Sequence, residues 1–355
     1  MLAIEPRRQP SRAWSLLSPA IAIALTLCVG ALLFGLAGRD PGHALYVLFI
    51  QPLTSTYGLT ELLVKATPLI LIATGLAIGF RANVWNIGAE GQYTVGALAG
   101  GGLALAFHDS TSPLLLPAVL LAGCAGGMAW GAIPALLRTR FNVNEILSSL
   151  MLTYVAILLL SWLVHGPWRD PDGYNFPESR LLSDAATLPI LVDDTRLHAG
   201  LLFALLAVAG AWVLMGRSVV GFQLRVSGQS RIAAHYAGYS TTGLVWFALL
   251  LSGGLAGLAG ISEVSGTINQ LLPTISPGYG FTAIIVAFLG RLHPLGIIPA
   301  GLLIALSYIG GELAQIEVGV PAAVTGIFQG VLLFFLLGCD LLTGYRIRLA
   351  PVRGT

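Results

Sequence analysis

The side chains best suited to chemistry lie in one short stretch between two long apolar runs. Residues 80–92 read Phe-Arg-Ala-Asn-Val-Trp-Asn-Ile-Gly-Ala-Glu-Gly-Gln, so amide, carboxylate and aromatic groups alternate with glycine. If the flanking runs span a membrane, polar and glycine-interrupted backbone persists there only where protein buries it or a water-filled cavity borders it. Interrupted helices of this kind can bind polar solutes through their exposed ends. The other interpretation is a polar turn outside the membrane beside Arg81, followed by a glycine-rich helix.

A second stretch, residues 217–240, has the character of a docking segment. It is polar, and residues 231–237 favour a short helix that ends at Gly238. A short amphipathic helix outside the bilayer can fit a groove on a soluble partner. The alternative is an interfacial helix that only connects two spans.

Several catalytic devices are excluded by the residues. The single lysine, Lys65, follows Val64, so there is no Gly-Lys-Ser/Thr ending of a nucleotide-binding P-loop. Neither His-Glu-x-x-His nor Gly-x-Ser-x-Gly occurs. The three cysteines show no metal-binding spacing, so we expect no metal site and no cofactor bound by this chain.

Composition identifies the elements that position these stretches. Hydrophobic residues make up 56% of the 355 residues and charged residues only 10%, whereas a soluble domain carries roughly 25% charged residues. Most of the outer surface must therefore face lipid. The net charge of +2 and the scattered basic residues give no sign of a nucleic-acid partner.

About ten runs are apolar enough to approach the roughly 20 residues that a membrane-spanning helix needs. We therefore predict an all-α fold, a single transmembrane domain over residues 1–355 with about ten helices. The predicted spans are 17–38, 62–80, 92–107, 114–137, 145–165, 198–216, 242–261, 280–290, 294–311 and 323–339.

The distribution of basic residues predicts the orientation. With both termini in the cytoplasm, thirteen of the 18 basic residues fall on the cytoplasmic side: Arg7, Arg8, Arg12, Arg81, Arg138, Arg140, Arg217, Arg225, Arg231, Arg291, Arg346, Arg348 and Arg353. The long polar segment 166–197 is then external. It either docks an outer partner or is a solvated loop.

Glycine spacing predicts how the helices pack. Helix association in lipid relies on small residues that let backbones approach. Small-xxx-small pairs recur at Gly75/Gly79, Gly96/Gly100, Gly123/Gly127, Gly127/Gly131, Gly253/Gly257 and Gly326/Gly330. These pairs predict a closely packed bundle.

Three motifs in a fixed order carry a family resemblance. They are Asn86-Ile-Gly-Ala-Glu-Gly-Gln92, Asn144-Glu-Ile-Leu-Ser-Ser-Leu-Met-Leu-Thr-Tyr154 and Gly221-x-x-Leu-Arg-x-x-Gly-x-x-x-x-Ala-Ala-x-Tyr-Ala-Gly238. Over residues 40–345 the chain resembles the permeases of ATP-binding-cassette (ABC) importers of the ribose and branched-chain amino acid type. The closest branch is that of the nucleoside and simple-sugar permeases.

The resemblance implies a transport subunit in a bacterial inner membrane that uses three kinds of protein partner. An ABC ATP-binding subunit hydrolyses the ATP, a second permease subunit, identical or related, completes the path, and an extracytoplasmic substrate-binding protein delivers substrate. The predicted substrate pathway comprises Asn83, Trp85, Asn86, Glu90, Gln92, Tyr93 and Asn144. The predicted ATPase-coupling residues are Gly221, Arg225, Gly228, Arg231, Ala233, Ala234 and Gly238.

Two further expectations concern mechanism. Glycine-rich segments that end near Glu90 and Glu263 hint at a two-half inverted repeat. The alternative function is an ion-coupled secondary transporter acting alone. Its candidate ionisable groups within the spans are Glu90, Glu145 and Glu263, and Glu90 or Glu263 would couple the ion. The aromatic and amide groups at 83–93 suit either a nucleoside, through base stacking and ribose hydrogen bonds, or a simple sugar.

Overall fold

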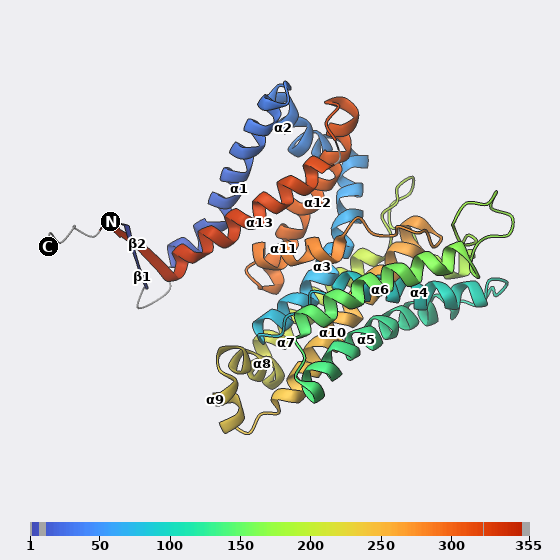
Figure 1. Ribbon diagram of the computed structural model, residues 1–355. Helices are drawn as coiled ribbons and strands as arrows, with labels where there is room; N and C mark the ends of the chain where they lie inside the picture. The colour runs from blue at the N-terminus through green and yellow to red at the C-terminus, as the bar shows by residue number, and fades with distance from the viewer. Residues whose placement is uncertain (1, 7–11, 322, 350–355) are drawn as a thin grey trace. The chain divides into compact units, whose positions relative to one another are not determined.

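Helices provide nearly all of the regular structure. A computed structural model describes residues 2–6, 12–321 and 323–349, and Figure 1 labels its main elements. In chain order these are β1 (Leu2–Pro6), α1 (Arg12–Leu36), α2 (Pro41–Phe49), η1 (Gln51–Thr54), α3 (Thr56–Arg81), α4 (Ala89–Ala106), α5 (Leu115–Phe141), α6 (Glu145–His165), η2 (Asp184–Ala186), α7 (Gly200–Arg217), α8 (Val219–Gln229), α9 (Arg231–Tyr236), α10 (Thr241–Glu263), η3 (Val264–Ile268), α11 (Tyr279–Leu289), α12 (Pro294–Glu317), α13 (Ala323–Gly344) and β2 (Tyr345–Leu349).

Each of the ten predicted apolar runs coincides with a helix. In the described part of the chain, seven helices are long and apolar enough to cross a membrane, namely α1, α3, α5, α6, α7, α12 and the continuous stretch of α10 and η3. The apolar helices at 279–289 and 323–339 are shorter. The helical membrane bundle is confirmed, while the number of ten spans and the orientation stay predictions. Of the residues predicted to be cytoplasmic, Arg7, Arg8 and Arg353 lie outside the described residues.

The chain divides into two compact units. The first comprises residues 1–58 and 306–355. In it α1 packs along α13, and Phe34, Leu48, Val318 and Phe328 contribute to a shared apolar core. β1 and β2 pair antiparallel, a short two-stranded sheet that the all-α prediction did not include.

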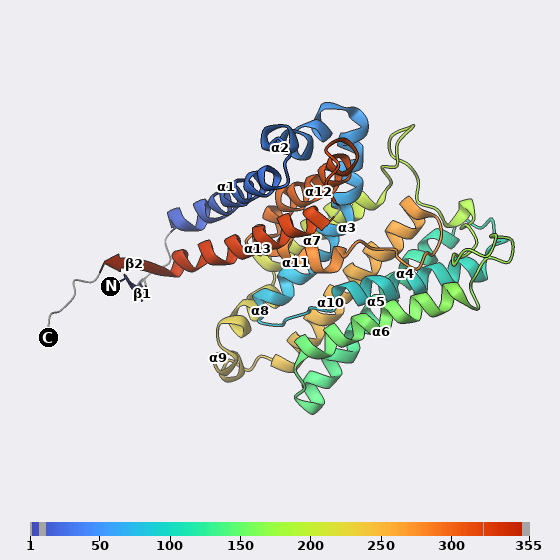
Figure 2. The ribbon, with the colours of Figure 1, turned by 45° about the horizontal axis from the view of Figure 1, so that its top comes forward.

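The second unit, residues 59–305, holds the predicted functional stretches. Its centre is α10, which packs against both α4 and α5, while α6 packs against α4. Figures 1 and 2 show these four helices running side by side.

Glycine allows this close packing, as the sequence predicted. A methyl group added at Gly96 would lie 2.2 Å from the Cα atom of Gly257, and one added at Gly127 would lie 2.1 Å from the carbonyl oxygen of Gly253. We call Gly96, Gly123, Gly127, Gly253 and Gly257 the glycine seam. Real side chains essentially never approach so closely, so the seam admits only glycine without a shift of the helices. The pair Gly326/Gly330 differs, because nothing in the described chain lies within 4 Å of either added methyl.

Two irregular segments interrupt the second unit. The first is residues 82–88 between α3 and α4, which we call the α3–α4 joint. It contains Asn83, which is left-handed at φ 55°. The second follows the π-helical turn η3, where Asn269 is left-handed at φ 59°, and runs to Gly278 before α11. Each of the two segments leads directly into a new helix, α4 or α11. An inverted-repeat relation between them stays a prediction.

Candidate functional site

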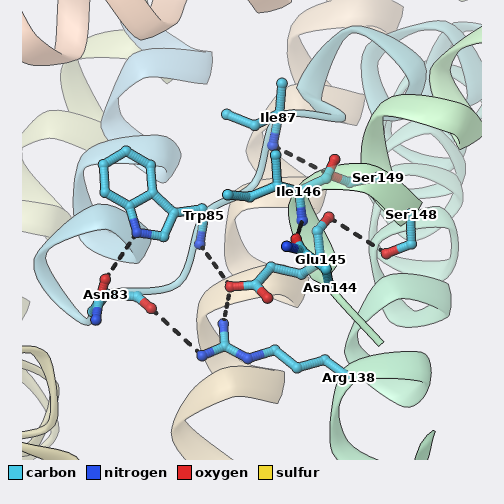
Figure 3. Close-up of polar contacts among 9 residues, drawn as sticks. All are labelled: Asn83, Trp85, Ile87, Arg138, Asn144, Glu145, Ile146, Ser148 and Ser149. Atoms are coloured by element: carbon cyan, nitrogen blue, oxygen red, sulfur yellow. Dashed lines mark hydrogen bonds and ion pairs between the residues drawn. The ribbon is translucent and has the colours of Figure 1, made fainter. Parts of the chain in front are cut away.

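The α3–α4 joint is fixed at its start by one amide and two aromatic rings. The Trp85 indole Nε1–H donates a hydrogen bond of 2.8 Å to Asn83 Oδ1 (Figure 3). The same indole lies 4.9 Å from the Phe80 ring and 6.1 Å from the Phe288 ring, centroid to centroid. Asn83 is exposed and Trp85 is half-buried, so this end of the joint keeps an accessible surface.

A single carboxylate ties the joint to two further helices. Glu145, the first residue of α6, forms an ion pair with Arg138 near the end of α5. Its Oε1 also accepts the backbone N–H of Trp85 at 3.4 Å. Arg138 Nη2 donates to the carbonyl oxygen of Asn83 at 3.5 Å (Figure 3). Sequence reasoning treated Glu145 only as a candidate ionisable group within the spans and gave Arg138 no role at the site, although a spacing of seven residues across a turn could have suggested the pair.

Asn144 serves as a helix cap. It is exposed, and its Oδ1 accepts the N–H of Ile146 at 2.8 Å, the N-terminal capping arrangement for α6. Ser149, one turn into α6, accepts the N–H of Ile87 through its hydroxyl at 3.2 Å. The second sequence motif therefore holds the joint against α6.

The amides of Asn86 and Gln92 bind each other. Asn86 Nδ2 donates to Gln92 Oε1 at 2.7 Å and to Ser252 Oγ on α10 at 2.9 Å. Asn86 Oδ1 accepts from Gln92 Nε2 and from the N–H of Gly88, both at 3.1 Å. Both amides are buried. All the usual hydrogen-bonding positions of the Asn86 side chain are thereby occupied, which favours a positioning role over direct contact with a solute.

Glu90 and Tyr93 join α4 to the start of α11. The Oε2 atom of Glu90 accepts the N–H of Gly280 at 2.5 Å, a favourable place for a carboxylate because the first N–H groups of a helix have no partner within it. The hydroxyl of Tyr93 donates to the carbonyl oxygen of Ile275 at 3.4 Å. Its ring meets the edge of the Tyr279 ring at 6.2 Å. Both side chains are buried.

The predicted coupling loop forms two short helices beyond the end of α7. Ser218 Oγ caps α8 by accepting from Gly221, and Ser230 Oγ caps α9 by accepting from Ala233. The chain then turns at Gly238, which is left-handed at φ 77°, as the predicted C-terminal stop requires.

The coupling residues separate into an inner and an outer set. A methyl group at Gly221 would lie 2.1 Å from the carbonyl oxygen of Leu214 in α7, and one at Gly228 would lie 1.9 Å from that of Arg81. These two glycines therefore let α8 pack closely against α7 and the end of α3, and Ala234 of α9 is buried.

The outer set comprises Arg225, exposed on α8, and residues on or just after α9. Arg231, Ala233 and Gly238 are exposed, and so are two apolar side chains that sequence reasoning missed, Ile232 (72% exposed) and Tyr236 (87% exposed). An exposed isoleucine and tyrosine on a six-residue helix form an apolar contact surface.

The segment 166–197 is only partly a free loop. Its backbone N–H groups at Ser179, Leu182 and Leu188 donate to carbonyl oxygens of Leu271, Asn269 and Ser265, at 3.0, 2.8 and 2.8 Å. Arg196 forms a two-pronged ion pair with the buried Glu61 of α3, at 2.9 and 2.5 Å. Much of the segment is thus anchored to the chain, while Tyr174 (94% exposed) stands out from it.

The remaining candidate carboxylate, Glu263, is buried at the end of α10, and its Oε2 has no hydrogen-bond partner in the described chain. The three candidate carboxylates therefore occupy three separate surroundings. Glu90 lies on a helix start, Glu145 in an ion pair and Glu263 in the interior.

Comparison with known proteins decides the family. Residues 58–337 match the family described as the permease component of the branched-chain amino acid transport system. The chain is an ABC transporter permease of this family.

Alignments with several named relatives cover almost the whole permease. It is 39% identical to a glucose ABC transporter permease of Haloferax volcanii over 98% of this chain and 94% of the relative. It is 34% identical to a guanosine ABC transporter permease of Bacillus subtilis, over 90% of this chain and 92% of the relative. It is 28% identical to a nucleoside ABC transporter permease of Lactococcus lactis, over 90% of each.

These matches confirm the resemblance found in the three motifs. The permease is a transport subunit, and permeases of this family work with separate ATP-binding subunits and with a paired permease. The comparisons do not favour an ion-coupled carrier acting alone. The roles of individual residues in the substrate pathway and in coupling stay predictions.

Proposed function

We propose that this permease forms the translocation path of an ABC importer for simple sugars or nucleosides. The named relatives support this, since one is a glucose permease and two are permeases for guanosine or nucleosides. In the proposal an external binding protein delivers the solute at the 166–197 face, and a second permease completes the path. The subunit lies in the cell (inner) membrane with both termini in the cytoplasm, and only its ATP-binding partner uses ATP.

The observation that carries the proposal is the apolar surface of α9. Ile232 and Tyr236 are exposed on the same short helix as the buried Ala234, and Gly228 of α8 fits closely against the carbonyl oxygen of Arg81. A short helix that is packed on its own chain and exposes an aromatic and an aliphatic side chain can fit a groove on a partner. Side chains of this kind contribute most of the binding energy at protein interfaces. We assign this surface to the ATP-binding subunit, with Arg231 beside it able to donate charge-assisted hydrogen bonds.

For the solute we propose contact at the accessible end of the α3–α4 joint. Trp85 offers an aromatic face and Asn83 an exposed amide. Asn86 and Gln92 hold the joint in place, and Glu90 and Tyr93 hold α4 against α11. Asn144 supports the same joint from the start of α6.

The test compares two tyrosine substitutions, one in the segment that precedes α7 and one on α9, which follows α7 and α8. Tyr236→Ser removes the exposed ring on α9, and Tyr174→Ser removes an equally exposed ring from the 166–197 segment. We expect Tyr236→Ser to reduce co-purification with the ATP-binding subunit at least about tenfold, the loss typical of an interface anchor. Tyr174→Ser should leave it unchanged. Both variants should insert and unfold like the wild type, since neither ring is buried.

Equal retention of the ATP-binding subunit by the two variants, with normal uptake, would refute the assignment of α9. A second measurement addresses the alternative function. Vesicles that contain only this chain should show no solute uptake when an ion gradient is imposed. Gradient-driven uptake that Glu263→Gln abolishes would establish the ion-coupled carrier instead.

A further inference from the structure

A small polar cavity lies where three helices of the second unit meet. Its volume is about 220 Å³, and its lining residues come from the end of α5, the start of α9 and the start of α10: Arg138, Thr139, Arg231, Thr241, Thr242 and Val245. It is below the range of roughly 300–1,000 Å³ that encloses a drug-sized ligand. A single small group fits it better than a whole nucleoside.

The lining is positively charged. It includes two guanidinium groups and no carboxylate. Arg138 is balanced by Glu145 outside the lining (Figure 3), whereas Arg231 is exposed and no acidic residue borders the cavity beside it. A site of this kind attracts an anion, and guanidinium groups match the oxygens of phosphate.

The other side of the cavity supplies hydrogen-bond donors. Thr241 and Thr242 are the first two residues of α10, a helix of 23 residues. Ser240 already occupies the next two N–H groups, because its Oγ accepts from Gly243 and its carbonyl oxygen accepts from Leu244. The N–H groups of Thr241 and Thr242 have no acceptor within the helix, and their hydroxyls add two further donors.

The depth of the cavity points to the chemistry of its ligand. The end of α5 and the start of α10 are ends of two candidate membrane spans, and a span ends where the hydrocarbon core meets the headgroup layer. Phosphate is the anion of that layer. We propose that Arg138, Arg231, Thr241 and Thr242 form a binding site for a phosphate group, supplied by an anionic phospholipid headgroup or by free phosphate.

Occupancy would tie the short helix α9 to α5 and α10, which already pack closely against each other. Arg231 belongs to α9, Arg138 to α5, and the threonines to α10. One phosphate that accepts from all of them fixes α9 relative to the membrane-spanning helices, as a charge-assisted network does. The site stands on the cavity alone, so it does not depend on the proposed ATPase contact of α9.

The test uses the purified full-length chain without any partner, in an uncharged detergent. The midpoint of thermal unfolding is followed with dioleoylphosphatidylglycerol against dioleoylphosphatidylcholine, and with inorganic phosphate against chloride at equal ionic strength. Near tenfold excess over the dissociation constant, a bound anion should raise the midpoint by about 2 °C. Arg231→Gln and Thr242→Val, both at exposed positions, should lose that rise. Arg140→Gln, an exposed arginine of the same α5 turn that does not line the cavity, should keep it.

The pattern of shifts identifies the source. A rise with phosphatidylglycerol alone assigns the site to a lipid headgroup, a rise with phosphate alone assigns it to the free anion, and a rise with both shows that either source is bound. The proposal is overturned if neither ligand shifts the wild type. It is also overturned if Arg140→Gln loses as much of the rise as Arg231→Gln, because the effect would then be a general response to positive charge.

Discussion

His198 provides a quantitative test of how the segment before α7 is held. The residue lies outside the membrane-spanning helices, two residues before α7, and only 1% of its surface is exposed. Its Nδ1 accepts the N–H of Gly200 at 3.1 Å, and its Nε2 lies 3.3 Å from the hydroxyl of Thr267. A backbone N–H can only donate, so Nδ1 must be unprotonated and the ring neutral, with its proton on Nε2. Protonation of Nδ1 would break the bond to Gly200.

Burial lowers the pKa of His198 from its usual 6.5 to about 4. The native state therefore binds fewer protons than the unfolded state between these values, and stability falls as the pH falls through this window. At 1.36 kcal/mol per pKa unit the full difference is about 3 kcal/mol, reached below pH 4. Between pH 7.5 and pH 5 the same two pKa values predict a loss of about 2 kcal/mol.

The assay is unfolding of the purified permease in mild detergent at pH 7.5, 6 and 5, followed by tryptophan fluorescence. His198→Gln keeps an acceptor for Gly200 but cannot titrate, so its stability should fall by about 2 kcal/mol less than that of the wild type over this range. Carboxylates titrate equally in both proteins and cancel in the difference. His165→Gln, at an exposed histidine of α6, should follow the wild type. Parallel pH profiles for wild type and His198→Gln would refute the conclusion that burial keeps this ring neutral.

Two further substitutions test the packing of the second unit. Gly127→Val places a side chain against the carbonyl oxygen of Gly253 and should lower the free energy of unfolding by about 1–3 kcal/mol or more. The control is Gly210→Val, at a glycine with open space around it, which should have little effect on thermal unfolding. Asn86→Leu removes four hydrogen bonds and leaves their partners unpaired. It should lower the free energy of unfolding by at least about 2 kcal/mol, and with it the unfolding midpoint and the yield. The KM of the transporter that still assembles should be unchanged. A raised KM at normal stability would instead place Asn86 in contact with the solute.

The sequence was most informative where one physical rule dominates. Each apolar run predicted a helix because a chain in lipid must satisfy its backbone hydrogen bonds internally. The glycine pairs on three of the helices predicted the seam, and Gly238 predicted the end of α9, since both depend on the absence of a side chain. The pair Gly326/Gly330 shows the limit of the rule, because spacing alone does not say whether a helix faces a partner within its own chain.

Contacts between distant residues were not predictable. Ser252 lies 166 residues from Asn86, and nothing local marks it as the partner of a buried amide. Gly280 lies 190 residues from Glu90. The predicted coupling segment forms two short helices, but which of its residues face inward was not predictable, because an alanine or glycine is equally compatible with either face. Only the close contact of α8 with α7 shows that Gly221 faces inward, and only the burial of Ala234 on α9 shows the same for that residue.

The hydrogen-bond inventory of the joint also bears on where a solute can pass. A solute hydroxyl that bound Asn86 would have to displace Gln92, Ser252 or the N–H of Gly88, and each displaced buried group would cost about 1–3 kcal/mol. Asn83 and Trp85 impose a smaller cost, because Asn83 is exposed and Trp85 is only half-buried. The glycine seam leaves α4, α5 and α10 no room to slide past one another. These helices therefore act as one block, and we expect movement driven by the ATP-binding subunit to enter through α8 and α9 and to shift the block as a unit.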